Sequence, residues 1–146
     1  MQEYCQCGHT IQLELRTVIF AGKVSITQVP VMSCEECSYY ELLPCVKEEL
    51  KQYLAELGSE PETIRISFAD RNELSSLILT SKLYGVQLTP STARQLMKAV
   101  NERINTLLDV YRYAQSSGDQ DWTQDIERRL SQLSTLSSYP ILSASS

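Results

Sequence analysis

Four of the five cysteines fall into two tight pairs near the start of the 146-residue chain. Cys5 and Cys7 form the first pair, and Cys34 and Cys37 form the second pair after a span that alternates between apolar and polar residues. Thiolates bind Zn²⁺ tetrahedrally at about 2.3 Å, and a hairpin can bring two cysteine-bearing turns within reach of one ion. The spacing therefore predicts a zinc ribbon in which these four cysteines hold a structural zinc ion.

The first pair has the spacing CxC, whereas zinc-binding turns usually have the spacing CxxC. Gly8 follows Cys7 directly, as in turns whose backbone passes close to the metal. His9, the single histidine of the chain, could replace Cys5 as a nitrogen ligand. Cys45, the fifth cysteine, stands at the start of a predicted helix, where we expect a half-buried thiol that binds no metal.

Two other uses of the cysteines are less consistent with the sequence. Cys34 and Cys37 could form a redox-active pair, but such pairs usually open a helix, and this one follows a predicted strand. Disulfide bonds are disfavoured because the cysteine count is odd and the first residues do not resemble a signal peptide. No apolar stretch reaches the roughly 20 residues that a membrane span requires. We therefore expect a cytoplasmic protein with reduced thiols.

The segment between the cysteine pairs alternates apolar and polar residues with a period of two, which predicts a β-hairpin. Residues 21–23, Ala-Gly-Lys, form its predicted turn. The alternation changes phase near Thr27 and Gln28, as a β-bulge would cause. Pro30 has no N–H to donate, so we expect this part of the strand to lie at an edge of the sheet.

Downstream of the second pair, apolar residues recur at intervals of three and four, which predicts helices. The predicted elements are a helix over 45–57 with Pro44 at its first position, a strand over 63–68, a helix from a capping box at Asp70 and Glu73 to Tyr84, a helix from Thr89 and Pro90 to residue 117, and a helix from Asp119 to Leu136. The strand could join the edge of the hairpin or pair with a second copy of the chain. The last two helices can fold back on each other as an αα-hairpin.

These patterns together predict an α+β fold, with an amino-terminal zinc-ribbon hairpin and a mainly helical carboxy-terminal half. We expect a zinc-ribbon domain with one packed helix over residues 1–58. A polar stretch over 59–62 marks the boundary to a helical domain with one short strand over 59–137. Residues 138–146 are rich in serine and are predicted to form a flexible tail.

The amino-terminal part resembles the YgiT-type zinc-finger family, which includes the amino-terminal zinc domains of MqsA-like antitoxins. The resemblance covers about residues 1–58 and rests on Cys7-Gly8, the hairpin, Val29-Pro30-Val31, Cys34-Glu35-Glu36-Cys37 and the helix that follows. It implies that Cys5, Cys7, Cys34 and Cys37 hold a structural zinc ion and that the domain contacts a partner protein, in some members a toxin. The CxC spacing and Ser38, which stands where a second glycine is expected, depart from the family pattern.

MqsA-like proteins continue into a helix-turn-helix domain that binds DNA. In this chain the segment from Leu74 to Val100 has a similar order of elements, and Lys82, Arg94 and Lys98 could contact phosphates. However, its connecting turn and its second helix are both longer than in that motif. A net charge of −5 also disfavours nucleic-acid binding, because such affinity comes largely from neutralising phosphates.

The sequence offers few candidates for catalysis. It has a single histidine and contains no GxSxG motif and no phosphate-binding loop, and four thiolate ligands would close the coordination sphere of a zinc ion. We therefore expect a non-enzymatic regulatory or adaptor protein that binds another protein through its helical half, with a long helix that could also mediate homo-oligomerisation. The alternatives are an antitoxin-like DNA-binding transcriptional regulator and a regulator switched by thiol oxidation.

Overall fold

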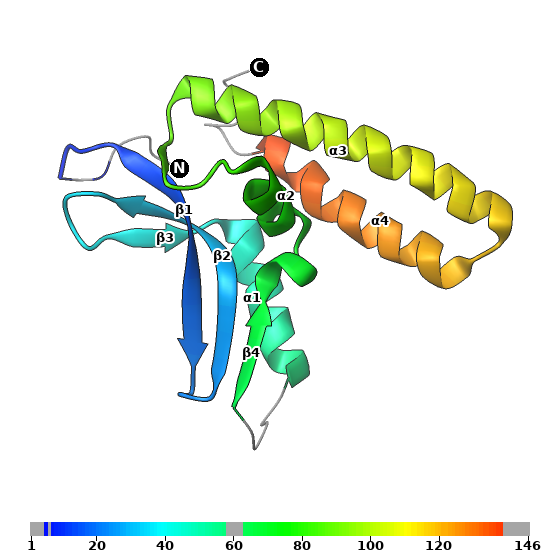
Figure 1. The fold of residues 1–146 in the computed structure, drawn as a ribbon, viewed down its shortest axis with the longest axis horizontal. Coiled ribbons are helices and arrows are strands. Elements are labelled where there is room, and N and C mark those ends of the chain that lie inside the picture. Colours follow the sequence, from blue (N-terminus) through cyan, green and yellow to red (C-terminus); the bar gives the residue numbers. More distant parts are fainter. Residues whose placement is uncertain (1–4, 6, 58–62, 139–146) are drawn as a thin grey trace.

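A computed structural model describes residues 5, 7–57 and 63–138, and it has the predicted α+β fold (Figure 1). Within these residues a five-stranded sheet is accompanied by four α-helices. The strands are β1 (Ile11–Phe20), β2 (Val24–Cys34), β3 (Tyr40–Leu42), β4 (Ile64–Ser67) and β5 (Val86–Gln87). The α-helices are α1 (Pro44–Leu57), α2 (Glu73–Ser81), α3 (Pro90–Ser117) and α4 (Gln120–Ser134). None of these helices is long and apolar enough to cross a membrane.

Strand β2 is central in the sheet. It pairs antiparallel with β1 along its length. On its other side, β2 pairs antiparallel with β3 through residues 31–33 and parallel with β4 through residues 24–27. β5 adds to the outer side of β1 at residues 12–13. The predicted strand over 63–68 therefore joins the sheet of its own chain as β4, and a short 3-10 helix from Phe68 to Asp70 follows it.

The predicted β-bulge is confirmed in β2. Thr27 and Gln28 lie opposite the single residue Thr17 of β1, and Gln28 has a φ of 64°. The extra residue shifts the alternation of the strand, so that Ile26 and Val29 lie on the same face although three positions separate them. Both side chains are fully buried. The bulge therefore explains the change of phase in the sequence.

Pro30 lies at a local gap on one side of β2. Residues 31–33 pair with β3 and residues 24–27 pair with β4, so within the described sheet no strand flanks Pro30 on that side. β2 as a whole is central, but the prediction that the part with Pro30 lies at an edge is confirmed locally, because there β2 has a strand neighbour only in β1. The hydroxyl of Ser75 in α2 donates to the Gln28 carbonyl at 2.5 Å in the same gap.

Helix α1 has the predicted bounds and the predicted apolar face. Val46, Leu50 and Tyr53 are buried in the core that the sheet and the helices share. The predicted boundary over 59–62 lies outside the described residues. β4 and β5, which follow that boundary in sequence, extend the same sheet as β1 and β2.

The start of α2 differs from the predicted capping box. Asn72 is the N-cap, and its side chain accepts a hydrogen bond from the Ser75 N–H at 2.9 Å. Asp70 instead ends the preceding 3-10 helix, which shifts the start of α2 by two residues. Glu73 therefore lies in the first turn of α2, where it is buried against arginines from α3 and α4.

Helix α2 also ends earlier than predicted. It stops at Ser81 because Lys82 adopts the left-handed conformation, with a φ of 57°, and donates its N–H to the last turn. The predicted end at Tyr84 is therefore wrong. The N–H of Gly85 donates to the Leu13 carbonyl at 2.7 Å, which fixes the segment that leads into β5. A tertiary contact thus replaces the predicted last turn of the helix.

Helices α3 and α4 have their predicted starts. Thr89 caps α3 with Pro90 at its first position, Gly118 ends α3, and Asp119 caps α4. The two helices run side by side and project away from the sheet (Figure 1). Trp122 of α4 is partly exposed. The fully buried side chains between the two helices include Ala114, Ile126 and Leu133. The predicted tail over 138–146 lies outside the described residues except for Ser138, which ends a 3-10 helix.

Candidate metal centre

The structure brings the four predicted ligands together. The sulfurs of Cys5, Cys7, Cys34 and Cys37 all lie within 4.8 Å of one another. The distance is 3.4 Å from Cys5 Sγ to Cys37 Sγ and 3.4 Å from Cys7 Sγ to Cys34 Sγ. A tetrahedral zinc ion with sulfurs at about 2.3 Å separates these sulfurs by about 3.8 Å. The cluster could therefore hold a metal ion, and its sulfurs are too far apart to be disulfide-bonded.

The first cysteine pair lies in a tight turn before β1. The Cys5 N–H donates to the His9 carbonyl at 2.8 Å, and the Gly8 N–H donates to the Cys5 carbonyl at 2.9 Å. Gly8 has a φ of 91°, a conformation that residues with a Cβ rarely adopt. The glycine after Cys7 is therefore required by the turn that presents both sulfurs.

The second cysteine pair follows the end of β2. Cys34 is the last residue of β2, and its N–H donates to the Tyr39 carbonyl at 3.0 Å. The chain then returns as β3, in which Tyr40 pairs with Ser33 of β2. This return holds Cys37 beside the first turn. β3 was not predicted, because a strand of three residues is too short to show an alternating pattern.

Backbone N–H groups donate to the sulfurs of the second turn. Burial raises the pKa of the Cys34 thiol, but hydrogen bonds from the N–H groups of Cys37 and Glu36 outweigh burial and lower this pKa to about 6. The N–H of Tyr39 lowers the pKa of Cys37, but the neighbouring thiols of Cys5 and Cys34 together with burial raise it to about 12.

The first turn shows the same kind of interaction. A hydrogen bond from the His9 backbone N–H lowers the pKa of Cys7, but the Cys34 thiol and burial have the larger combined effect, and the net pKa is raised. Thiols crowded together in this way resist ionising simultaneously unless a cation neutralises them. Metal binding would therefore release protons from the cluster.

His9 and Cys45 lie outside the cluster formed by the four cysteines. His9 is exposed, and its Nδ1 lies 3.4 Å from Cys7 Sγ. Cys45 is half-buried in the first turn of α1, as predicted. Among the described residues, the one group of three or more potential ligand atoms that all lie within 4.8 Å of one another consists of the four cysteine sulfurs. The geometry therefore favours Cys5 over His9 as the fourth ligand.

A polar network that the sequence did not reveal lies on the strands beside the cluster. The Ser33 hydroxyl donates to the Glu14 carboxylate at 2.8 Å, and Arg16 Nε donates to the same carboxylate at 3.0 Å. The Arg16 guanidinium lies 5.6 Å from the centre of the Tyr40 ring. These contacts connect β1, β2 and β3 at the end of the sheet that bears the cysteines.

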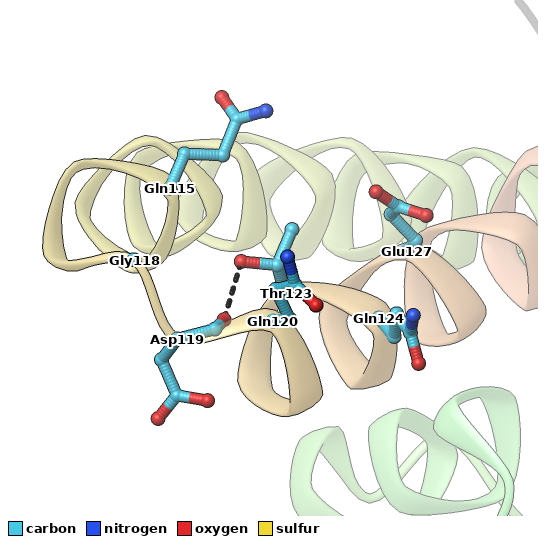
Figure 2. A pocket seen from close by; sticks show the side chains of 7 residues that line it. All are labelled: Gln115, Gly118, Asp119, Gln120, Thr123, Gln124 and Glu127. Atoms are coloured by element: carbon cyan, nitrogen blue, oxygen red, sulfur yellow. Dashed lines mark hydrogen bonds between the residues drawn. The ribbon is translucent and has the colours of Figure 1, made fainter.

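A second surface feature is a hollow at the end of the α3–α4 pair that projects away from the sheet (Figures 1 and 2). Figure 2 shows this hollow and its polar lining, in which the Thr123 hydroxyl donates to the Asp119 carbonyl at 2.7 Å. Its two carboxylates already have partners within the chain, because Asp119 caps α4 and Glu127 accepts a hydrogen bond from Tyr111. Its lining residues are Gln115, Gly118, Asp119, Gln120, Thr123, Gln124 and Glu127.

Comparison of the chain with models of protein families, with curated proteins and with solved structures finds no match. The resemblance to the YgiT-type zinc-finger family therefore stays a prediction from the cysteine spacing and the hairpin. The chemistry of the cluster follows from its donor atoms. These are four sulfurs whose spacing is close to that around a tetrahedral zinc ion.

Proposed function

We propose that the chain is a non-enzymatic regulatory or adaptor protein in which Cys5, Cys7, Cys34 and Cys37 hold a structural Zn²⁺ ion. The convergence of the four sulfurs within 4.8 Å is the observation that carries this proposal. Four thiolates complete the tetrahedral coordination of zinc and leave no open position for water or substrate. A site of this kind stabilises a fold and does not catalyse hydrolysis.

The metal would fasten the first turn of the chain to the end of β2. Cys5 and Cys34 are buried and belong to the hydrophobic core, whereas Cys7 and Cys37 are exposed. The free energy of metal binding would therefore contribute directly to the folding of this part of the protein.

The partner-binding role is proposed for the projecting α3–α4 pair. A shallow hollow with a mainly apolar lining lies between these two helices, and its apolar side chains come from both of them. Exposed apolar surface of this kind on a helix pair is typical of sites that bind other proteins. The residues that line it are Ile104, Leu108, Tyr111, Glu127, Leu130, Ser131 and Ser134.

An exposed aromatic pair lies on another face of the same two helices, because Tyr113 stands about 180° from Ile104 and about 140° from Leu108 around the axis of α3. Tyr113 of α3 is 66% exposed, and its ring contacts the ring of Trp122 in α4 edge to face, with centroids 5.8 Å apart. Tyrosine and tryptophan are enriched where protein surfaces meet, because they contribute large contact areas at a low cost in conformational entropy. The pair is therefore a separate exposed feature, and the partner-binding role is proposed for the hollow that Leu108 lines.

Comparative capture tests the partner-binding role. The zinc-loaded wild-type protein, Leu108→Asp and Thr106→Asp serve as baits under reducing conditions. Thr106 is exposed on the same helix but about 200° away around its axis, so it controls for the added charge. We expect Leu108→Asp to lose a partner that both other baits retain, and to bind the purified partner at least about tenfold more weakly. Equal retention by all three baits contradicts the proposal.

The same surface could join two copies of the chain. In that case the wild-type protein and Thr106→Asp form a dimer at tens of micromolar, and Leu108→Asp shifts the equilibrium towards monomer. Multi-angle light scattering on the three zinc-loaded proteins distinguishes a self-interaction from binding to a different protein.

A further inference from the structure

The four sulfurs form two close pairs, and each pair combines an exposed cysteine with a buried one. Exposed Cys37 lies 3.4 Å from buried Cys5, and exposed Cys7 lies 3.4 Å from buried Cys34. An exposed thiolate can react with an oxidant from solvent, and a nearby thiolate can then resolve the oxidised sulfur. Each pair therefore contains both groups that disulfide formation requires.

Both close pairs connect the first cysteine turn to the second. Cys5 and Cys37 are separated by 32 positions in sequence, and Cys7 and Cys34 are separated by 27 positions. The sulfurs of each pair would need to approach from 3.4 Å to about 2.05 Å to form a disulfide bond. Both links would join the two turns, whereas the redox pairs of CxxC motifs form a link within one turn.

We propose that a peroxide oxidises the zinc centre to two disulfides, Cys5–Cys37 and Cys7–Cys34, and thereby releases Zn²⁺. The inference rests on the proposed zinc site and adds its regulation. In the first step the exposed thiolate attacks one peroxide oxygen, the O–O bond breaks, and a sulfenic acid forms while hydroxide leaves. In the second step the buried thiolate attacks this sulfur, the S–S bond forms, the S–O bond breaks, and a second hydroxide leaves.

The reaction balances for each pair. Two thiolates lose two electrons to one hydrogen peroxide, and two protons convert the two hydroxides to water. Disulfide sulfurs no longer carry the charge that holds the ion, so zinc leaves. Four thiolates and one Zn²⁺ give the centre a net charge of minus two, and two disulfides give it a net charge of zero.

Oxidation in this pattern would change the metal content and charge of the centre while keeping the two turns joined. Both disulfides would fasten the turn before β1 to the end of β2, as the zinc ion does in the reduced state. Links within the turns, Cys5–Cys7 and Cys34–Cys37, would instead leave the first turn without a disulfide or metal link to the second turn. The disulfide pattern therefore decides between a switch in surface charge and a local loss of structure.

The test uses the full chain with Cys45→Ser. This substitution removes the fifth thiol, which could otherwise form a disulfide with one of the four. Elemental analysis first measures zinc in the reduced protein, which tests the proposed function by itself. Hydrogen peroxide is then added while a chromogenic chelator reports zinc release, and the remaining thiols are alkylated. Cleavage after Glu35 or Glu36 separates Cys34 from Cys37 before mass spectrometry without reduction.

We expect release of one zinc ion per chain and a product in which the peptide with Cys5 and Cys7 is linked to the two other cysteine peptides. Cys7→Ser should retain a Cys5–Cys37 link, and Cys5→Ser should retain a Cys7–Cys34 link, which assigns the pairs. A reductant should restore zinc binding. Zinc release together with a Cys34–Cys37 link would contradict the proposed disulfide pattern, although the zinc site itself would stand. Zinc that stays bound throughout oxidation would have the same meaning. Reduced protein without zinc overturns both.

Discussion

Glu73 in α2 and Arg129 in α4 form a two-pronged ion pair inside the helical half. Arg129 Nε and Nη2 donate to the two oxygens of the Glu73 carboxylate at 2.9 and 3.2 Å. Arg103 of α3 donates to the same carboxylate at 2.5 Å, and Gln132 of α4 accepts the Glu73 N–H at 2.8 Å. The Glu73 side chain is only 7% exposed. One carboxylate thus fixes α2 against both helices of the projecting pair.

Removal of the Glu73 charge should destabilise the protein. Glu73→Gln leaves two partly buried arginines without their carboxylate, and we expect the free energy of unfolding to fall by about 1 to 3 kcal/mol. Urea unfolding of the zinc-saturated protein measures this change. As a control, Asp109→Asn removes an exposed partner of Arg112 and should change stability by less than about 0.5 kcal/mol. Equal effects of the two substitutions would show that the Glu73 network contributes little.

The contribution of Glu73 should depend on pH in one direction. Burial raises the pKa of this carboxyl, but the hydrogen bonds from Arg129 and Arg103 outweigh burial and hold it below its ordinary value. A depressed folded-state pKa stabilises the protein above the unfolded pKa of about 4.3, and this stabilisation is lost as the pH falls through the folded-state pKa.

The stability difference between the wild-type protein and Glu73→Gln should therefore stay constant from about pH 8 to pH 5 and shrink below about pH 4. Loss of zinc in acid affects both proteins and cancels in the difference. Unfolding curves of the two proteins at matched pH measure it. A difference that increases in acid would mean that the folded-state pKa is raised.

The bulge in β2 should tolerate glycine better than a β-branched residue at position 28. Gln28 has a φ of 64°, which costs a residue with a Cβ about 1 to 2 kcal/mol. We expect Gln28→Gly to remain within about 1 kcal/mol of the wild-type stability, since the strain relieved is offset by chain entropy. Gln28→Val should lose about 1 to 3 kcal/mol. Thermal unfolding tests both, and equal stability of the two variants would argue against the bulge.

Substitution of Cys5 and substitution of His9 should change the metal content of the protein to different degrees. Cys5 Sγ lies within the cluster, whereas the exposed His9 ring lies beside Cys7. We expect His9→Ala to retain one zinc ion per chain and Cys5→Ser to lose most of it, as measured by elemental analysis after purification at neutral pH. The opposite pattern would make His9 the fourth ligand.

Local signals made much of the fold predictable. The bulge was visible as a change of phase at Thr27 and Gln28, and the long helix was bounded by Thr89 at its start and Gly118 at its end. These features depend on residues near one another in sequence, so a pattern of polar and apolar positions records them. The convergence of the four cysteines was likewise predictable, because a hairpin brings its two ends together.

Other features depend on tertiary contacts that leave little trace in sequence. β3 and β5 contain three and two residues, and each forms only because β2 or β1 offers a free edge. Glu73 fits a capping box by spacing, but Arg103 and Arg129 hold it, and both lie far away in sequence. Lys82 ends α2 in a left-handed conformation that its residue type does not predict. Local rules failed where distant residues decide the structure.

X-ray absorption spectroscopy at the zinc edge tests the central claim most directly. The protein is purified under reducing conditions, and its bound metal is examined without removal. The account predicts one zinc ion per chain surrounded by four sulfur atoms at about 2.3 Å. Absence of zinc, or a first coordination shell with nitrogen or oxygen atoms at about 2.0 Å, would contradict a centre formed by Cys5, Cys7, Cys34 and Cys37.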